Sequence, residues 1–158
     1  MMSVENNEIT LRKITEETLW GILKLEVKEH QGKFVASNAV SIAEAYFSNY
    51  AWFRGIYYGD KPVGFVMLYL DKIKPEYYLW RFMIAKQHQG KGLGYAAMQL
   101  IIQYVKGLPN ARELVTSYVP GEASPAPFYK KLGFYETGEW DEDEKVMKLD
   151  LISWVETK

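Results

Sequence analysis

Cysteine is absent from the 158-residue sequence. Without a thiol the chain forms no disulfide, offers no thiolate to a metal and excludes covalent catalysis through cysteine. Histidine is almost as scarce, since His30 and His88 are the only two. Two histidines are too few for a histidine-based metal site, so we expect a functional site without a metal.

Two further absences concern partners and location. The formal net charge is -1, so the chain lacks the excess of basic residues from which nucleic-acid binders draw most of their non-specific affinity. No apolar run approaches the roughly 18 residues of a membrane span, and the first residues, MMSVENNEIT, contain no basic region followed by an apolar one. We expect a cytoplasmic protein without a nucleic-acid or membrane partner.

Apolar residues, by contrast, are plentiful enough for a substantial core. The sequence is 48% hydrophobic and 15% aromatic. A chain of this length buries one core and is too short for two comfortable domains. No internal repeat or linker interrupts it, and we therefore expect a single domain over residues 1–158.

The order of the predicted elements indicates an α/β domain with a mixed sheet. Alternating and β-branched stretches predict strands, whereas apolar residues three and four apart predict helices. The predicted strands cover residues 8–14, 53–58, 62–70, 77–85, 113–119, a stretch from 134, and 145–152. The predicted helices are one after a cap at Thr15, one from Ser41, one from the glycines at 90–94, and one over 125–132.

Apolar spacing also predicts which helix faces are buried. In the first helix the stripe runs from Leu19 to Val27, and in the second Ile42, Ala45 and Tyr46 share one face. In the third, the expected buried face consists of Leu93, Ala96, Ala97, Leu100, Ile101, Tyr104 and Val105.

The last predicted helix and the acidic stretch behind it complete the pattern. We expect Ser124 to cap this helix, Pro125 to occupy its first position and Gly133 to end it. Residues 136–144 contain six carboxylates and no basic residue. This stretch predicts an acidic turn, which either steers a cationic ligand or is a solvated hairpin tip.

Three glycines, Gly90, Gly92 and Gly94, stand at the mouth of the third predicted helix. Glycine permits positive φ and has no side chain to keep a ligand away. The first N–H groups of a helix lack intrahelical partners and carry the positive end of the macrodipole, about half a charge. These features predict an anion or phosphate site, although glycines also serve simply to cap a turn.

Two nucleotide-binding patterns compete for this loop. A Walker loop requires Ser or Thr after its Gly-Lys pair, whereas Gly92 follows Lys91, so that pattern is excluded. A dinucleotide fold matches Gly92-x-Gly94-x-x-Ala97, with Glu113 as the ribose-binding acid. Because Glu113 lies at the start of its predicted strand and not at the C-terminal end, and because the unit comes late in the chain, a nicotinamide nucleotide is the weaker alternative.

The segment Gln89-Gly90-Lys91-Gly92-Leu93-Gly94 resembles the Q/R-x-x-G-x-G/A signature of the GNAT superfamily of acetyl-CoA-dependent N-acetyltransferases. Downstream, SPAPFYKKLGF (124–134) resembles the final helix of that family, which usually ends in FYxxxGF. Two more segments, HQGKFVASNAVSIAEA (30–45) and TGEWDEDEKVMKLDL (137–151), resemble bacterial spermine/spermidine (diamine) acetyltransferases. The resemblance spans nearly the whole chain. It implies the GNAT fold, a mixed and mostly antiparallel sheet of about six or seven strands flanked by about four helices.

The resemblance also implies acetyl-CoA as the co-substrate and indicates where it binds. Loop amides over residues 90–95 would hold its pyrophosphate, and free backbone groups of the fourth strand would pair with its pantetheine arm. Lysines would screen the phosphates. The implied acetyl-CoA residues are Phe82, Met83, Ile84, Gln89, Gly90, Lys91, Gly92, Leu93, Gly94, Tyr95 and Lys130.

Tyr129 matches the general acid of the family, which protonates or hydrogen-bonds the departing CoA sulfur. A free tyrosine has a pKa near 10 and a thiol about 8.5, so complete proton transfer is uphill by about 2 kcal/mol. A hydrogen bond to the sulfur, or a pKa lowered by neighbouring Lys130 and Lys131, would remove this cost. The alternative for Tyr129 is a core aromatic beside Phe128.

The acceptor amine requires a base. An alkylammonium group is neutral in on the order of one molecule in a thousand at pH 7, so a carboxylate would assist its deprotonation. Polyamine acetyltransferases often carry an acidic residue in the fourth strand, where this chain has Trp80-Arg81. We expect the base to be Glu29 or Glu26, with Glu44 as a further candidate.

The sequence therefore predicts an N-acetyltransferase that uses direct attack by a primary amine in a ternary complex, with a polyamine as the leading acceptor. An aminoglycoside or a peptide N-terminus is the alternative acceptor. A module that senses acyl-CoA or polyamine without catalysis is the alternative function. Glu122 stands where the family commonly has a cofactor-contacting Asn, and that role is not transferred to it. The oligomeric state is left open between a monomer and a homodimer.

Overall fold

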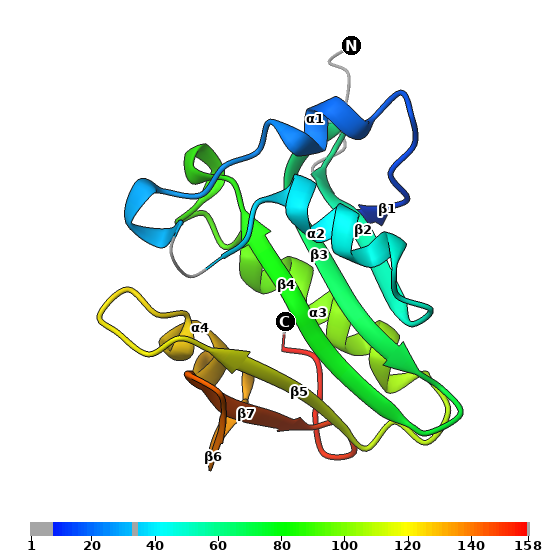
Figure 1. Ribbon diagram of the computed structural model, residues 1–158, viewed down its shortest axis with the longest axis vertical. Coiled ribbons are helices and arrows are strands. Elements are labelled where there is room, and N and C mark those ends of the chain that lie inside the picture. Colours follow the sequence, from blue (N-terminus) through cyan, green and yellow to red (C-terminus); the bar gives the residue numbers. More distant parts are fainter. Residues whose placement is uncertain (1–7, 33–34, 158) are drawn as a thin grey trace.

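The computed structural model describes residues 8–32 and 35–157. These residues form one seven-stranded sheet with the order β1-β2-β3-β4-β5-β7-β6 (Figure 1). The strands are β1 (Ile9–Arg12), β2 (Ala51–Tyr58), β3 (Lys61–Asp71), β4 (Glu76–Ile84), β5 (Glu113–Tyr118), β6 (Tyr135–Asp141) and β7 (Glu144–Asp150). Neighbouring strands are antiparallel except β4 and β5, which are parallel. The expected mixed, mostly antiparallel sheet is confirmed. A dinucleotide fold, with its mostly parallel sheet, is excluded.

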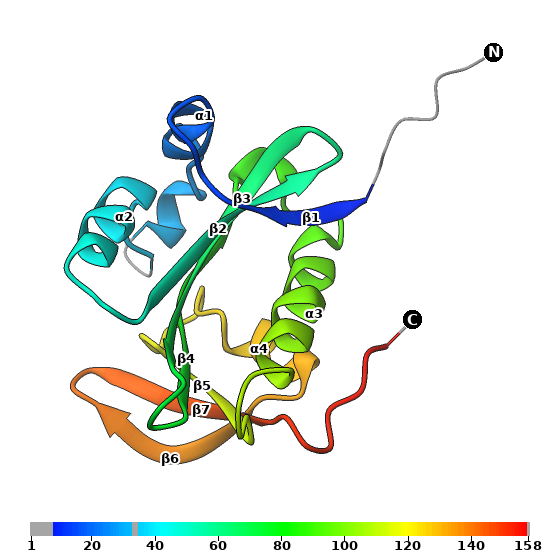
Figure 2. The same cartoon turned by 90° about the vertical axis from the view of Figure 1, so that its right-hand side faces the viewer.

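Helices cover the two faces of the sheet, as Figure 2 shows. The described residues contain four α-helices: α1 (Leu19–Leu23), α2 (Asn38–Tyr46), α3 (Leu93–Lys106) and α4 (Ala126–Leu132). Two short 3-10 helices, η1 (Glu29–Gln31) and η2 (Lys86–His88), precede α2 and α3. One face carries α1 and α2, and the opposite face carries α3 and α4. Within the described residues no helix is both long and apolar enough to cross a membrane.

Each face of the sheet has its own apolar core. Ile101 of α3 and Ile84 of β4 belong to one core, whereas Ile22 of α1, Ala45 of α2 and Met83 of β4 belong to the other. The end of β4 is therefore buried on both faces, and burial of each such side chain stabilises the fold by about 1.5–3 kcal/mol. This part of β4 is a firm wall for whatever lies beside it.

β4 and β5 touch only at their beginning. Their register contains the single pair Tyr78↔Val115, and beyond it the two strands diverge, as Figure 1 shows. Between Leu79 and Arg81, β4 carries a bulge at Trp80, because Leu79 pairs with Leu68 of β3 and Arg81 with the preceding residue. A bulge bends its strand and redirects the side chains that follow it. The opening between β4 and β5 is thus a consequence of the backbone.

The first two helices differ from their predicted bounds. α1 ends at Leu23, so Leu25 and Val27 of the predicted stripe lie beyond it. The two residues are two positions apart, which suits extended chain, and Leu25 is nevertheless buried. α2 begins at Asn38 and not at Ser41, because the Ser37 Oγ accepts a hydrogen bond from the backbone N–H of Val40 at 3.2 Å.

The predicted helix faces also need correction. Tyr46 is 84% exposed and does not share the buried face of α2. In α3 the fully buried residues include Met98 and Ile102, whereas Leu100 and Tyr104 are each 38% exposed. The buried stripe is rotated by about one residue from the expected one, since the sheet and α4 contact α3 from one side only.

Near the C-terminus, Gly133 ends α4 with a φ of +109°, as expected. Ser124, however, makes no capping hydrogen bond, and Pro125 occupies the N-cap position. Residues 136–144 are not a turn but mostly strand, since β6 runs to Asp141 and β7 starts at Glu144. Five of the six acidic residues are nevertheless exposed, as in a solvated hairpin, and only Glu144 is half-buried.

Candidate active site

A cleft of about 800 Å³ occupies the opening between β4 and β5. Its walls come from both ends of the sequence and from both faces of the sheet. The lining residues are Val27, Gln31, Gly32, Val35 and Ala36 before α2, residues 79–84 of β4, His88, Gln89, Gly90, Gly92, Gly94 and Tyr95 around the loop, residues 116–119 of β5 and its end, Ala123, Ser124, Pro125, Pro127, Phe128, Tyr129 and Lys131 around α4, and Glu144 of β7. The sequence motifs at 89–94 and 124–134 thus meet in one cavity.

The glycine loop forms one end of the cleft, which we call the loop side (residues 82–84 and 88–95). Gly90 and Gly92 have φ of +78° and +79°, a region that L-residues with a side chain rarely adopt. A Cβ at either position would meet no atom within 4 Å. The absent side chains therefore leave open space at the mouth of α3, which is what close approach by a ligand requires.

The N-terminus of α3 presents free amides to this space. The first i→i−4 hydrogen bond runs from Ala96 N–H to the Gly92 carbonyl at 3.1 Å, so the amides of Leu93, Gly94 and Tyr95 have no intrahelical acceptor. They add to the positive end of the helix dipole. The geometry suits an anion such as a phosphate.

Side-chain amides hold the loop in place. Gln89 donates a hydrogen bond to the Ile84 carbonyl at 2.9 Å, and it exchanges hydrogen bonds with the amide of Gln31 at 2.9 and 3.2 Å. The first residue of the loop motif is thus tied to β4 and to η1. A loop rich in glycine needs such ties, because glycine loses more conformational entropy on ordering than other residues do.

The end of β4 forms the wall beside the loop. Phe82, Met83 and Ile84 all line the cleft, and Phe82 stacks on Phe128 of α4 with ring centroids 5.7 Å apart. Among the described residues, no strand pairs with β4 on its β5 side after Tyr78. Its peptide groups there are available to a ligand that can hydrogen-bond an extended backbone.

The lysines do not lie as predicted. Lys91 and Lys130 are exposed and do not line the cleft, whereas Lys131 does. The Lys131 ammonium lies 5.6 Å from the centre of the Tyr95 ring. Leu93 packs against the core beneath the loop. Of the predicted acetyl-CoA residues, therefore, Lys91, Leu93 and Lys130 have no side chain on the wall.

Tyr129 lies on α4 at the centre of the cleft and is only 7% exposed. Its ring packs between Phe128 and Phe134, with centroid distances of 5.8 and 5.5 Å. The ring therefore belongs to the apolar core, as one interpretation of the sequence has it, and the residue also lines the cleft. A hydroxyl held in this way has little freedom to move.

Burial raises the pKa of Tyr129 to about 12, and the nearby negative charge of Glu144 acts in the same direction. A hydrogen bond with the Thr116 hydroxyl lowers the pKa but is outweighed. The Thr116 hydroxyl also donates to the Leu79 carbonyl at 3.3 Å. The pKa lowered by Lys130 and Lys131, which the sequence suggested, is thus wrong, because desolvation disfavours the charged phenolate.

None of the carboxylates predicted as bases lines the cleft. Glu26 is exposed and lies 3.9 Å from Lys86, and Glu29 is exposed at the start of η1. Glu44 forms a 3.3 Å ion pair with Arg81, its side chain 40% exposed. Glu122, which was given no role, is exposed in the loop before α4.

A different carboxylate does line the cleft, and the sequence did not single it out. Glu144, the first residue of β7, lies on the side opposite the loop, which we call the hairpin side (Ser117, Tyr118 and Glu144). The Ser117 hydroxyl donates to Glu144 at 3.4 Å. Strand alternation was the available signal: Met147 and Leu149 are buried against the core, so Glu144 belongs to the opposite face.

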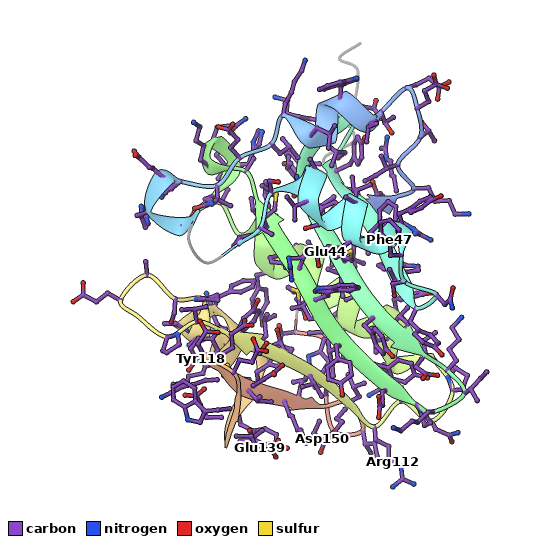
Figure 3. All side chains as sticks on the ribbon, viewed as in Figure 1. Glu44, Phe47, Arg112, Tyr118, Glu139 and Asp150 are labelled. Atoms are coloured by element: carbon purple, nitrogen blue, oxygen red, sulfur yellow. The ribbon has the colours of Figure 1, made fainter. Side chains whose placement is uncertain are left out.

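Tyr118 is the second missed residue. Its hydroxyl donates to both carboxylate oxygens of Glu136, at 2.7 and 2.9 Å. Burial and this carboxylate raise the pKa of Tyr118 to about 12. Figure 3 shows Tyr118 at the end of β5, with Glu44 on α2 above β4. The acidic hairpin therefore has one carboxylate, Glu136, engaged by a tyrosine and another, Glu144, in the cleft.

Three basic side chains, Arg81, His88 and Lys131, line the cleft. Arg81 lines it from β4, donating to the Trp80 carbonyl and pairing with Glu44. His88 and Lys131 lie on the loop side or near it, and burial together with Lys91 and Lys61 lowers the pKa of His88. In the part of the chain that the structure describes, no group of three or more metal-ligating side chains exists.

Comparisons with known proteins agree with this geometry. The model of the acetyltransferase (GNAT) family matches residues 21–134. A spermine/spermidine N(1)-acetyltransferase of Bacillus subtilis (strain 168) is 30% identical to this chain, over 90% of the chain and 99% of the relative.

Solved structures share the fold. Spermidine N-acetyltransferase from Vibrio cholerae, in complex with CoA and spermine, has a TM-score of 0.72 and 20% identity, covering 93% of this chain and 98% of the other. The ribosomal-protein-S18-alanine N-acetyltransferase from Escherichia coli has a TM-score of 0.68 and 15% identity, covering 91% and 94%. The chain therefore belongs to the acetyltransferase (GNAT) family of N-acetyltransferases, with acetyl-CoA as its acetyl donor.

Proposed function

We propose that this N-acetyltransferase acetylates the primary amine of a small cationic acceptor, with a polyamine such as spermidine or spermine as the leading substrate. The observation that carries the proposal is the relationship to the Bacillus subtilis enzyme over nearly the whole chain. The Vibrio cholerae structure with CoA and spermine supports it through a shared fold. A carboxylate on the hairpin side of the cleft is compatible with a cationic ligand.

In this proposal the loop side binds acetyl-CoA. The free amides at the start of α3 and the positive-φ turns at Gly90 and Gly92 hold the pyrophosphate. Phe82, Met83 and Ile84 offer their backbone groups on the open edge of β4 to the amides of the pantetheine arm. Lys131 takes the phosphate-screening role that the sequence gave to Lys130, because only Lys131 lines the cleft.

Tyr129 stabilises the departing sulfur. With its pKa at about 12 and that of a thiol near 8.5, complete proton transfer to the thiolate is uphill by about 5 kcal/mol. The proposal therefore assigns Tyr129 a hydrogen bond to the sulfur as the carbon–sulfur bond breaks. Its buried, tightly packed ring orients that bond without loss of entropy during the reaction.

The acceptor enters beside Tyr129 and attacks the acetyl carbon directly. Its nitrogen loses a proton before the carbon–nitrogen bond forms. Neither Glu26 nor Glu29 lines the cleft, so the proposal passes this proton to solvent water and gives the base role to neither residue. As the carbon–sulfur bond breaks, the nitrogen gives up a second proton and the sulfur takes up one, directly or through water, so that the amide and CoA thiol are released with one net proton passed to solvent.

Steady-state assays of CoA release test this proposal. Purified protein receives acetyl-CoA and, separately, spermidine, spermine, an aminoglycoside and a peptide with a free N-terminus. We expect the polyamines to give the largest kcat/KM. Activity on the aminoglycoside or the peptide with none on the polyamines would overturn the acceptor assignment. Tight acetyl-CoA binding with no product from any amine would indicate a sensor instead.

A further inference from the structure

We infer that Glu144 binds an ammonium group of the acceptor on the hairpin side of the cleft, at a nitrogen other than the one that is acetylated, and that this contact selects cationic acceptors. The inference rests on the proposed function and identifies the residue on which its substrate preference depends. It replaces the carboxylates that the sequence placed in the first two helices.

The backbone puts Glu144 in this position. β7 pairs with β5 so that Lys145 lies opposite Tyr118 and Val146 opposite Ser117. Glu144 therefore stands just beyond the end of β5, where that strand has already separated from β4. Because the core side of β7 is occupied by Met147 and Leu149, alternation turns Glu144 to the other face. The Ser117 hydroxyl then fixes one of its carboxylate oxygens at 3.4 Å.

The charges of the other side chains on the cleft wall favour Glu144 as the residue that binds the acceptor. Among the lining residues that the structure describes, Glu144 is the one carboxylate and the charged basic residues are Arg81 and Lys131, since the lowered pKa of His88 favours its neutral form. Arg81 is neutralised by Glu44 at 3.3 Å. Lys131 lies by Tyr95 on the loop side, where phosphates are expected. A cationic ligand is thus attracted to the hairpin side and an anionic one to the loop side.

The neighbouring tyrosine responds to this carboxylate. Both residues line the cleft, and the negative charge of Glu144 adds a smaller contribution, after burial, to the raised pKa of Tyr129. An ammonium bound to Glu144 offsets that negative charge and thereby lowers the pKa of Tyr129. Binding of the acceptor would in this way make Tyr129 a better hydrogen-bond donor to the departing sulfur.

Glu144→Gln tests the inference, because it keeps the size of the side chain and removes its charge. Glu139→Gln is the matched control: Glu139 lies on β6 of the same hairpin, is exposed and does not line the cleft (Figure 3). Charge-assisted hydrogen bonds to ions are strong enough to change affinity by about 10- to 100-fold. We measure kcat and KM for spermidine and for acetyl-CoA, and titrate spermidine into each protein with CoA bound.

We expect Glu144→Gln to raise the KM for spermidine by about 10-fold or more, with the KM for acetyl-CoA unchanged and kcat changed far less. Glu139→Gln should match the wild type. If the wild type acetylates spermidine and both variants keep its KM, the inference is overturned while the proposed function stands. If the wild type binds spermidine through Glu144 but transfers no acetyl group, the inference stands and the proposed function fails. If it neither binds nor acetylates spermidine, both fail.

Discussion

The two sides of the cleft are built in different ways. The loop side comes from one continuous stretch, in which the end of β4, the glycines and the start of α3 follow one another in the chain. The hairpin side is assembled from β5 and β7, and Glu144 is 26 or more residues from Ser117 and Tyr118 in sequence. A sequence motif therefore identifies the loop side, whereas no motif identifies the hairpin side.

The difference also concerns how each side attracts its ligand. On the loop side, the proposal assigns the binding to backbone amides and positive-φ glycines, so residue identity matters there mainly through the absence of side chains. On the hairpin side, side-chain charge and its neutralisation decide the preference, as the Arg81–Glu44 pair and Glu144 illustrate. Substitutions should therefore separate the two sides by which substrate's KM they change.

Tyr129→Phe should produce the largest effect, because Tyr129 lies between the two sides. The ring keeps its packing between Phe128 and Phe134, and only the hydroxyl is lost. We expect kcat to fall by about 100-fold, with the KM of both substrates within about threefold. Tyr135→Phe, an exposed tyrosine outside the cleft, is the control. An unchanged kcat in Tyr129→Phe would mean that Tyr129 has a structural role only.

Gly92→Ala addresses the loop side. A residue with a side chain at φ +79° costs about 1–2 kcal/mol, and the added methyl group occupies space that the ligand needs. We expect the KM for acetyl-CoA to rise by about 10-fold, while the KM for the amine changes little. Steady-state kinetics and thermal melting measure the two consequences separately.

Gly138→Ala separates strain from ligand binding. Gly138 in β6 has a φ of +82° and an equally open Cβ position, but it does not line the cleft. Both variants should therefore melt at a lower temperature than the wild type, and only Gly92→Ala should weaken acetyl-CoA binding. If both variants have the same KM for acetyl-CoA, the loop amides do not bind acetyl-CoA.

Glu44→Gln should have the smallest effect, since it acts on the acceptor through Arg81. Without its partner, Arg81 leaves an uncompensated positive charge on the cleft wall, which repels a cationic amine. We expect a rise of about threefold in the KM for spermidine that shrinks at high ionic strength. Glu26→Gln, which loses an exposed pairing with Lys86, is the control. A lower KM for spermidine in Glu44→Gln would contradict a cationic acceptor.

Much of the fold was accessible from the sequence because its signals are local. The apolar runs of β2 and β3, the glycine stop at Gly133 and the spacing of apolar residues in α3 are patterns of neighbouring residues along the chain. The wrong predictions share a cause: each depends on contacts between segments that are distant in the sequence. By local rules Ser41 is an acceptable N-cap. The helix starts after Ser37 instead, and Asn38, its first residue, donates a hydrogen bond to the Ile22 carbonyl at 2.9 Å.

The same division holds for the site. Tyr129 and the glycine loop were predicted residues, and the structure brings them into one cleft. Glu26 and Glu29 were candidates because they lie near the first two predicted helices, and the structure leaves both exposed and off the cleft wall. The raised pKa of Tyr129 was likewise missed, since desolvation by Phe128 and Phe134 outweighs the charges of lysines that remain in solvent.

By itself the sequence determined the loop and its chemistry, because glycine conformation and helix-end amides are properties of a short segment. The tertiary structure decided which carboxylate lines the cleft. The single registered residue pair between β4 and β5, the bulge at Trp80 and the register of β7 on β5 together open the cleft and place Glu144 on its wall. Strand register is set by packing across the whole sheet, and a one-residue slip would have turned Glu144 to the core.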